Sequence, residues 1–246
     1  MPELSKLLSK DIVGLKIIST YKCNKRCKFC YQSTFNSIDL NLEILAKKLL
    51  EIKSSFYPVF ITFQGGEHTV LKDWVKHIQI TSKIFPHSRI SITTNGSANL
   101  EDYAKAIDLG LSNISFSINE ADHTILDKAA FLSRRGDVTV RFNTVLDYDN
   151  LDFLKEIFEL AKNNRINFNI CSNVLEEDPA AFDTIMELIK PDTFDKPISH
   201  VTRFYKDGYQ FWLHHYAPEG YNQIYILPNG NFEVSNQKVI EGVGAF

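Results

Sequence analysis

Three cysteines lie within eight residues near the start of the chain, and their type and spacing indicate chemistry more directly than any other feature. Cys23, Cys27 and Cys30 follow the pattern Cys-x3-Cys-x2-Cys, and the fourth cysteine, Cys171, lies far along the chain. Thiolates are soft ligands that bind iron–sulfur clusters or zinc. Because a disulfide scaffold spreads its cysteines along the chain, this clustering favours a metal site in a reducing compartment.

Two kinds of metal site use clustered thiols of this sort. With three protein ligands, a [4Fe–4S] cluster keeps one iron open to a substrate or cofactor, whereas an electron-transfer ferredoxin supplies four cysteines. A structural zinc site needs four ligands, usually as two closely spaced pairs. The other candidate ligands, His68, His77 and Cys171, have no paired partner at such a spacing. The pattern therefore favours the iron–sulfur cluster.

The elements that must position these thiols alternate between short apolar strands and longer amphipathic helices. Residues 15–19 form a predicted strand that ends just before the cysteines. Six strand–helix pairs follow one another, and this alternation predicts a parallel sheet with helical crossovers. Six pairs are too few for the closed eight-unit barrel, so an open partial barrel and a doubly wound sheet both remain. The predicted strands are 15–19, 58–63, 89–93, 113–118, 138–146 and 167–171, and the predicted helices are 41–54, 71–85, 99–109, 122–133, 151–162 and 179–189.

Aromatic residues crowd the segment after Pro191, and two β-hairpins are predicted there. The first joins 204–205 to 209–213, and the second joins 223–227 to 231–234 across a Pro-Asn-Gly turn. We interpret this segment as a small β-rich extension of the preceding domain. Its aromatic residues suggest a hydrophobic wall beside a substrate pocket.

The overall composition limits the function. The chain has 246 residues, a formal net charge of -3 and 44% hydrophobic residues, as expected for one large folded domain. The near balance of charge argues against a broad surface for nucleic acids or anionic membranes. No apolar stretch approaches the ~20 residues of a membrane span, and residues 1–11 lack the apolar core of a signal peptide. We therefore expect a cytoplasmic protein with no nucleic-acid partner and no membrane contact.

Five segments, taken in order, resemble the motifs of the radical S-adenosylmethionine (SAM) superfamily. Cys23 to Cys30 is similar to the superfamily signature, with Phe29 in its aromatic position. The later segments are Gly-Gly-Glu at 65–67, Thr-Asn-Gly at 94–96, and the strand segments 115–119 and 140–146. The last resembles the subgroup that contains molybdenum-cofactor synthesis enzymes and peptide-modifying maturases. The resemblance covers about residues 15–190.

This resemblance implies a fold, two cofactors and a set of contacts. The fold is a partial (βα)6 TIM-like barrel over residues 1–190, with 191–246 as a small β-rich C-terminal extension. The three clustered cysteines would ligate one [4Fe–4S] cluster, whose fourth iron the amino and carboxylate groups of SAM would chelate. The residues implied to contact SAM are Phe29, Gly65, Gly66, Glu67, Thr94, Asn95, Ser117, Arg141 and Asn143.

The resemblance also implies a reaction. One electron, from a donor such as a flavodoxin or a ferredoxin, would cleave SAM to methionine and a 5′-deoxyadenosyl radical. That radical would take a hydrogen atom from a small molecule or a short peptide. No cysteine follows Cys171, so the extension lacks the thiols for the auxiliary cluster of peptide maturases, and a single cluster is expected. Cys171 ends a predicted strand, where it is either a hydrogen-atom donor or a buried apolar residue.

Two other functions stay open. A non-catalytic binding module stabilised by zinc or by an iron–sulfur cluster would use the same cysteines without cleaving SAM. A glycyl-radical activating enzyme would act on a partner protein, although the C-terminal extension argues against it. His214 and His215 are candidates for a metal-binding or acid–base role. Because adjacent strand residues point to opposite faces, the two imidazoles cannot act together, which favours a structural role for them.

Overall fold

The computed structural model describes residues 14–30, 38–119, 122–172, 178–198, 201–215 and 223–235. These residues form two compact units. The first comprises the described residues up to Ile114 together with those from Gln223 onward, and the second runs from Ser115 to His215. The chain passes from the first unit to the second within strand β4 (Leu111–Ser117).

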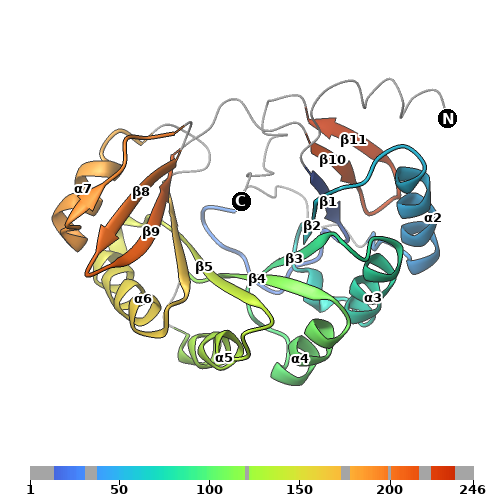
Figure 1. The fold of residues 1–246 in the computed structure, drawn as a ribbon, viewed down its shortest axis with the longest axis horizontal. Coiled ribbons are helices and arrows are strands. Elements are labelled where there is room, and N and C mark those ends of the chain that lie inside the picture. The colour runs from blue at the N-terminus through green and yellow to red at the C-terminus, as the bar shows by residue number, and fades with distance from the viewer. Residues whose placement is uncertain are drawn as a thin grey trace. The chain divides into compact units, whose positions relative to one another are not determined.

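The first unit is a mainly parallel sheet with its helices on one side (Figure 1). Its strands follow the order β11-β10-β1-β2-β3, in which β10, β1, β2 and β3 are parallel and β11 is antiparallel to β10. The strands are β1 (Gly14–Ile18), β2 (Phe60–Gln64), β3 (Arg89–Thr94), β10 (Gln223–Ile226) and β11 (Phe232–Ser235). The helices are α2 (Leu42–Lys53), the 3-10 helix η1 (His68–Val70), α3 (Trp74–Ile84) and α4 (Leu100–Asp108).

The two faces of this sheet differ in polarity. Ile17, Phe63 and Ile92 lie side by side on one face and are fully buried. The opposite face carries Lys16 and Thr62, also side by side, so the strands alternate between apolar and polar residues. Because side chains alternate along a strand, the apolar set is the core under the helices.

The second unit repeats this arrangement. Its strands follow the order β5-β6-β9-β8-β7, in which β5, β6 and β9 are parallel and β8 is antiparallel to both β9 and β7. The strands are β5 (Thr139–Val145), β6 (Asn167–Cys171), β7 (Thr193–Phe194), β8 (Val201–Lys206) and β9 (Tyr209–His214). The helices are α5 (His123–Ser133), the 3-10 helix η2 (Tyr148–Asn150), α6 (Leu151–Asn164) and α7 (Ala181–Ile189). Across the described residues, no helix has the length and apolar character that a membrane span requires.

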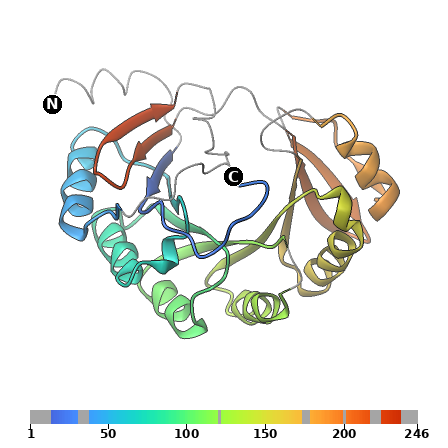
Figure 2. The same ribbon diagram turned by 180° about the vertical axis from the view of Figure 1, so that it is seen from behind.

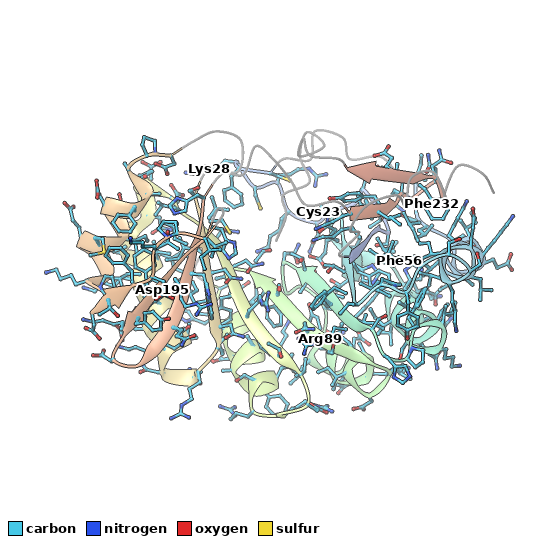
Figure 3. The ribbon with its side chains drawn as sticks, turned by 45° about the horizontal axis from the view of Figure 1, so that its top comes forward. Cys23, Lys28, Phe56, Arg89, Asp195 and Phe232 are labelled. Atoms are coloured by element: carbon cyan, nitrogen blue, oxygen red, sulfur yellow. The ribbon has the colours of Figure 1, made fainter. Side chains whose placement is uncertain are left out.

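The two predicted hairpins form, and each one joins the sheet of one unit. β9 pairs with β6 in parallel, and β10 pairs with β1 in parallel (Figure 2). Phe232 of β11 packs against α2, because Lys48 Nζ lies 4.3 Å from the centre of its ring (Figure 3). The sequence predicted the hairpins but not these pairings. The division into domains at residue 190 stays a prediction.

Two aromatic residues of the first hairpin belong to the core of the second unit. Phe204 and Phe211 are fully buried, and their stacked rings lie 5.2 Å apart between centroids. Phe158 of α6 and Phe182 of α7 contact them edge-on or at a tilt. For these two residues, the expectation of a wall beside a substrate pocket is wrong. They fill the space between the hairpin and the helices, where burial of large rings is most favourable.

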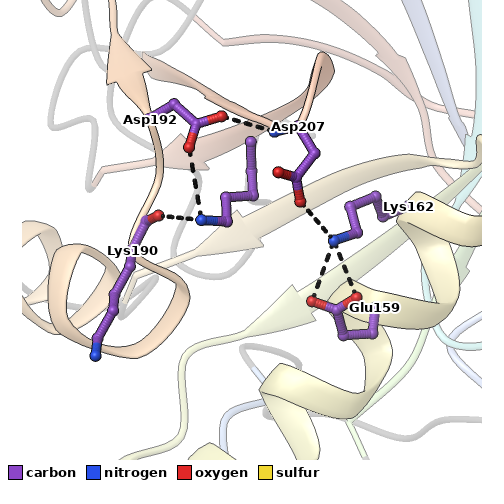
Figure 4. Close-up of polar contacts among 6 residues, drawn as sticks. Glu159, Lys162, Lys190, Asp192 and Asp207 are labelled. Atoms are coloured by element: carbon purple, nitrogen blue, oxygen red, sulfur yellow. Dashed lines mark hydrogen bonds and ion pairs between the residues drawn. The ribbon is translucent and has the colours of Figure 1, made fainter.

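Ion pairs also attach this hairpin to the helices (Figure 4). Lys162 Nζ of α6 lies 3.0 Å from Asp207 Oδ2 at the hairpin turn and 3.1 Å from Glu159 Oε2. Lys206 Nζ lies 3.5 Å from Asp192 Oδ1 and donates a hydrogen bond to the Lys190 carbonyl oxygen. Exposed ion pairs of this kind contribute at most about 1 kcal/mol each to stability. Packing of the phenylalanines therefore contributes more to holding the hairpin against the helices.

Candidate functional site

The cysteine loop follows β1 directly. Cys23 is half-buried (Figure 3), whereas Cys27 and Cys30 are exposed, and none of the three is part of a disulfide. The Cys30 amide donates to the Cys27 carbonyl oxygen at 3.1 Å, which closes a turn between the last two thiols. The Lys25 amide lies 3.4 Å from Cys23 Sγ as a hydrogen-bond donor. Burial raises the pKa of the Cys23 thiol, while that hydrogen bond opposes the rise.

The glycine turn after β2 runs against the backbone of this loop. The Gly66 amide donates to the Thr20 carbonyl at 2.9 Å, and the Glu67 amide donates to the Lys22 carbonyl at 2.7 Å. A Cβ atom on Gly66 would lie only 2.0 Å from the Lys22 oxygen. Gly65 has a φ of +129°, a conformation that other residues rarely adopt. Both glycines are therefore required for the two segments to approach this closely.

The Glu67 carboxylate joins the ends of β2 and β3. The side chain is 1% exposed, and its Oε1 accepts hydrogen bonds from the Thr69 amide (3.0 Å), the Thr69 hydroxyl (2.7 Å) and the Thr94 hydroxyl (2.8 Å). Its Oε2 accepts from the Asn95 amide at 2.5 Å. Burial raises the pKa of Glu67, and these hydrogen bonds oppose the rise. The Glu67 carboxylate is therefore fully engaged within the protein, and it ties the turn after β2 to the turn after β3.

Asn95 connects the end of β3 to the cysteine loop. Its Nδ2 donates to Asn24 Oδ1 at 2.7 Å and lies 3.9 Å from Cys23 Sγ. Thr94 Oγ1 lies 3.0 Å from the buried hydroxyl of Tyr103 in α4. The sequence predicted Thr94 and Asn95 but not Asn24 or Tyr103. In the sequence, the one sign of a role for Tyr103 was its hydroxyl group on the otherwise apolar face of the predicted helix 99–109.

His68 and His77 lie behind this site and are part of the core. His68 Nδ1 is 2.6 Å from the hydroxyl of the buried Ser19, and the His68 ring stacks on Phe63 at 4.6 Å. The two imidazole centroids are 5.4 Å apart. Burial lowers the pKa of His68 well below its ordinary value and that of His77 to about 4. Both rings are therefore neutral at physiological pH.

The donor set of the cysteine loop fits a thiolate-ligated iron–sulfur cluster. As the described side chains stand, no three Cys, His, Asp or Glu residues converge on a point that would hold a metal ion. Three cysteines outside any disulfide nevertheless lie on one loop, two of them exposed, with an amide N–H directed at the third sulfur. Three soft thiolates together with N–H donors to sulfur are typical of such clusters.

Four predicted residues belong to the second unit. Ser117 ends β4 and is half-buried, and Arg141 and Asn143 lie on the same face of β5. Asn143 Oδ1 accepts a hydrogen bond from Asn169 Nδ2 of β6 at 2.8 Å. Cys171, at the end of β6, is 2% exposed, and burial raises the pKa of its thiol. The roles expected for these residues stay predictions, as does that of the half-buried Phe29.

In the first unit, three consecutive parallel strands end in a thiol loop, a Gly-Gly-Glu turn and a Thr-Asn-Gly turn that are hydrogen-bonded to one another. These features define an α/β protein with a candidate cofactor site at the carboxyl ends of its strands. The chain belongs to the radical SAM superfamily, whose family model matches residues 17–142. This membership confirms that the chain is an enzyme, and it implies SAM and an iron–sulfur cluster as cofactors.

Curated relatives named GTP 3',8-cyclase are similar to parts of the chain. The protein from Syntrophomonas wolfei is 31% identical over 139 residues, which cover 53% of this chain and 40% of the relative. The protein from Clostridium botulinum is 27% identical over 213 residues, which cover 81% of this chain and 61% of the relative. The chain thus spans between 40% and 61% of the length of these two relatives.

Solved structures with a similar fold include SuiB of Streptococcus suis. The form bound to S-adenosylmethionine has a TM-score of 0.61 at 14% identity and covers 92% of this chain and 63% of SuiB. The form bound to the precursor peptide SuiA has a TM-score of 0.59 at 16% identity and covers 77% and 48%. This likeness confirms the expected fold class, an α/β fold of the TIM-like type.

Proposed function

We propose that the chain cleaves SAM reductively at a single [4Fe–4S] cluster and abstracts a hydrogen atom from a small-molecule or peptide substrate. The observation that carries this proposal is the hydrogen-bonded connection between the cysteine loop and the turns after β2 and β3. Gly66, Glu67 and Asn95 each bond directly to residues 20–24. A loop that ligates a cluster and a turn that receives SAM must be held at a fixed separation, and these bonds supply that restraint.

The residues of the chain have distinct parts in this proposal. Cys23, Cys27 and Cys30 would hold the cluster, whose chemistry would be to supply the one electron that breaks the C5′–S bond of SAM and gives methionine and a 5′-deoxyadenosyl radical. The backbone carbonyls at Gly65 and Gly66 accept hydrogen bonds from the SAM ammonium group. The Glu67 carboxylate positions that turn by holding the Thr94 hydroxyl and the Asn95 amide. The electron comes from an external donor such as a flavodoxin or a ferredoxin.

Anaerobic reconstitution with iron and sulfide tests the proposal. We expect the parent chain to gain absorbance near ~400 nm, of the sort given by thiolate-ligated clusters, and to form 5′-deoxyadenosine from SAM with a reductant. Alanine at Cys23, Cys27 or Cys30 abolishes both signals, whereas Cys171→Ala, the matched control, retains the absorbance. Tight zinc binding without that absorbance and without SAM cleavage would establish the non-catalytic module instead. Turnover only with a partner protein would indicate a glycyl-radical activating enzyme.

A purine nucleotide is a second candidate substrate, because the similarity to proteins named GTP 3',8-cyclase extends over 81% of this chain. Production of 5′-deoxyadenosine with added GTP, measured against ATP and against a mixture of short peptides, separates the two substrate classes. A rate that depends on GTP alone favours the nucleotide, and a rate that depends only on peptides excludes it.

A further inference from the structure

The second unit has a polar face on its three parallel strands β5, β6 and β9. Paired residues on neighbouring strands point to the same side of a sheet, so the register defines which residues share a face. From the amino ends of the strands, this face holds three rows: Arg141 with Asn167; Asn143, Asn169 and Trp212; and Val145, Cys171 and His214. The other face holds the fully buried phenylalanines 142, 168 and 211. The polar rows are therefore not the core of this unit.

Arg141 brings a positive charge to this face. Its guanidinium is half-buried and makes no ion pair with any residue that the structure describes, and its Nε is buried without a hydrogen-bond partner. None of the three rows contains an acidic residue. A partly buried guanidinium that lacks a carboxylate is unfavourable unless an anion from elsewhere pairs with it. The face is therefore complementary to a negatively charged ligand.

His214 faces the same side at the carboxyl end of β9. Burial, the charge of Arg141 and His215 together lower its pKa to about 4, so its ring is neutral at physiological pH. The hydrogen-bonded amides of Asn143 and Asn169 lie in the row between Arg141 and His214. A guanidinium, two amides and a neutral imidazole are groups that bind an oxyanion through several hydrogen bonds at once. His214 reaches this face only because β9 adds a parallel strand beside β6.

We propose that Arg141, His214 and the Asn143–Asn169 pair bind an anionic group of the substrate, a carboxylate or a phosphate. This inference rests on the proposed function, because a hydrogen-abstracting enzyme must hold its substrate near the carboxyl ends of its strands, where His214 lies. The charge of Arg141 acts on His214, so the long arginine side chain brings its guanidinium toward that end. It assigns Arg141 to the substrate rather than to the carboxylate of SAM. It also makes β9, a strand of the C-terminal extension, part of the substrate site.

Anion titration of the reconstituted full chain tests this assignment, with inorganic phosphate and acetate as the two probes. Isothermal titration calorimetry is carried out both without SAM and with SAM at saturation. We expect one of the two probes to bind under these conditions, and the one that binds identifies the source as a phosphate or a carboxylate. Arg141→Met weakens that binding at least tenfold, as does His214→Phe, because each removes a donor from a partly buried anion site. Arg141→Lys, which retains the charge, recovers part of the loss.

The matched control is Arg134→Met, which removes an exposed arginine at the end of α5, away from the three rows, and should leave anion affinity unchanged. Three results would overturn the assignment: no binding of either probe, binding that SAM abolishes, or an equal loss in the Arg134 variant. The second result would assign Arg141 to the SAM carboxylate instead. Failure of the proposed function is detected separately, because it appears as absence of SAM cleavage in the parent chain.

Discussion

The lysine buried in β1 makes the pH dependence of stability a direct test of the fold. Lys16 is 6% exposed, and its Nζ donates a hydrogen bond to Gln64 Oε1 at 3.2 Å. Burial lowers the pKa of Lys16 from 10.5 to about 8, because the buried ammonium loses its hydration. The unfolded chain therefore holds this proton more tightly than the folded chain does.

The sign and size of the effect follow from these two pKa values. Where the unfolded state binds more protons, the free energy of unfolding increases with pH. With a pKa of 10.5 in the unfolded chain and about 8 in the folded chain, the increase from pH 7 to pH 9.5 is about 2 kcal/mol. Lys16→Met keeps a flexible unbranched side chain but has no proton to titrate. The variant should therefore lack this increase.

Urea denaturation followed by far-UV circular dichroism, at several pH values from 7 to 9.5, measures the difference. Subtracting the Lys16→Met curve from the parent curve removes contributions that the two proteins share, such as those from tyrosines. Lys47→Met, at an exposed lysine of α2, serves as the control and should follow the parent. Curves for the parent and Lys16→Met that stay parallel to within about 0.5 kcal/mol would refute the burial of a charged lysine in β1.

Four further predictions concern single residues. Gly66→Ala should lower the free energy of unfolding by about 3 kcal/mol, because the added Cβ would collide with the Lys22 oxygen. The control, Gly136→Ala, should lower it by only about 1 kcal/mol, because there only the positive φ is unfavourable. Equal urea midpoints for the two variants would contradict this prediction. Glu67→Gln should cost about 2 kcal/mol, since an amide NH₂ then faces hydrogen-bond donors, and an unchanged thermal midpoint would argue against the bonds described. The pKa of His77 is 6.5 in the unfolded chain and about 4 in the folded chain, so the free energy of unfolding decreases as the pH falls. Between pH 7 and pH 5 the parent should lose about 2 kcal/mol more than His77→Phe. Cys171→Ala should leave turnover and product stereochemistry unchanged if that thiol is a buried apolar residue, and loss of solvent deuterium from the product would instead identify it as the hydrogen-atom donor.

Much of the fold was predictable because local signals and tertiary structure agree. The helix expected over 41–54 is observed at Leu42–Lys53, where Asn41 caps it through a side-chain bond to the Glu43 amide. The six predicted strands of the core are all present, each within about two residues of the expected bounds. The hairpin turns were equally clear, because Pro-Asn-Gly and Lys-Asp-Gly favour tight turns. These features depend on residues that are close in sequence.

The pairing of the hairpins with β1 and β6 could not be predicted. Parallel pairing leaves no local mark, since the partners Cys171 and His214 are far apart in the chain and their side chains differ in kind. The same holds for the site. The glycines and the Glu67 position were evident from the motif, whereas the bonds from Asn95 to Asn24 and from Ser19 to His68 join separate segments. The polar face around Arg141 emerges only from register across three strands.

The parallel pairing of the two hairpins has a consequence for aggregation. Without β10, one side of β1 would expose a row of unpaired backbone groups, and without β9 the same would hold for β6. Unpaired edges of this kind recruit strands from other molecules. The hairpins replace them with edges that are harder to extend: β7 has two residues, and β11 is short and carries Glu233. The segment after residue 190 therefore protects each sheet against association with other chains, as well as contributing His214 to one of them.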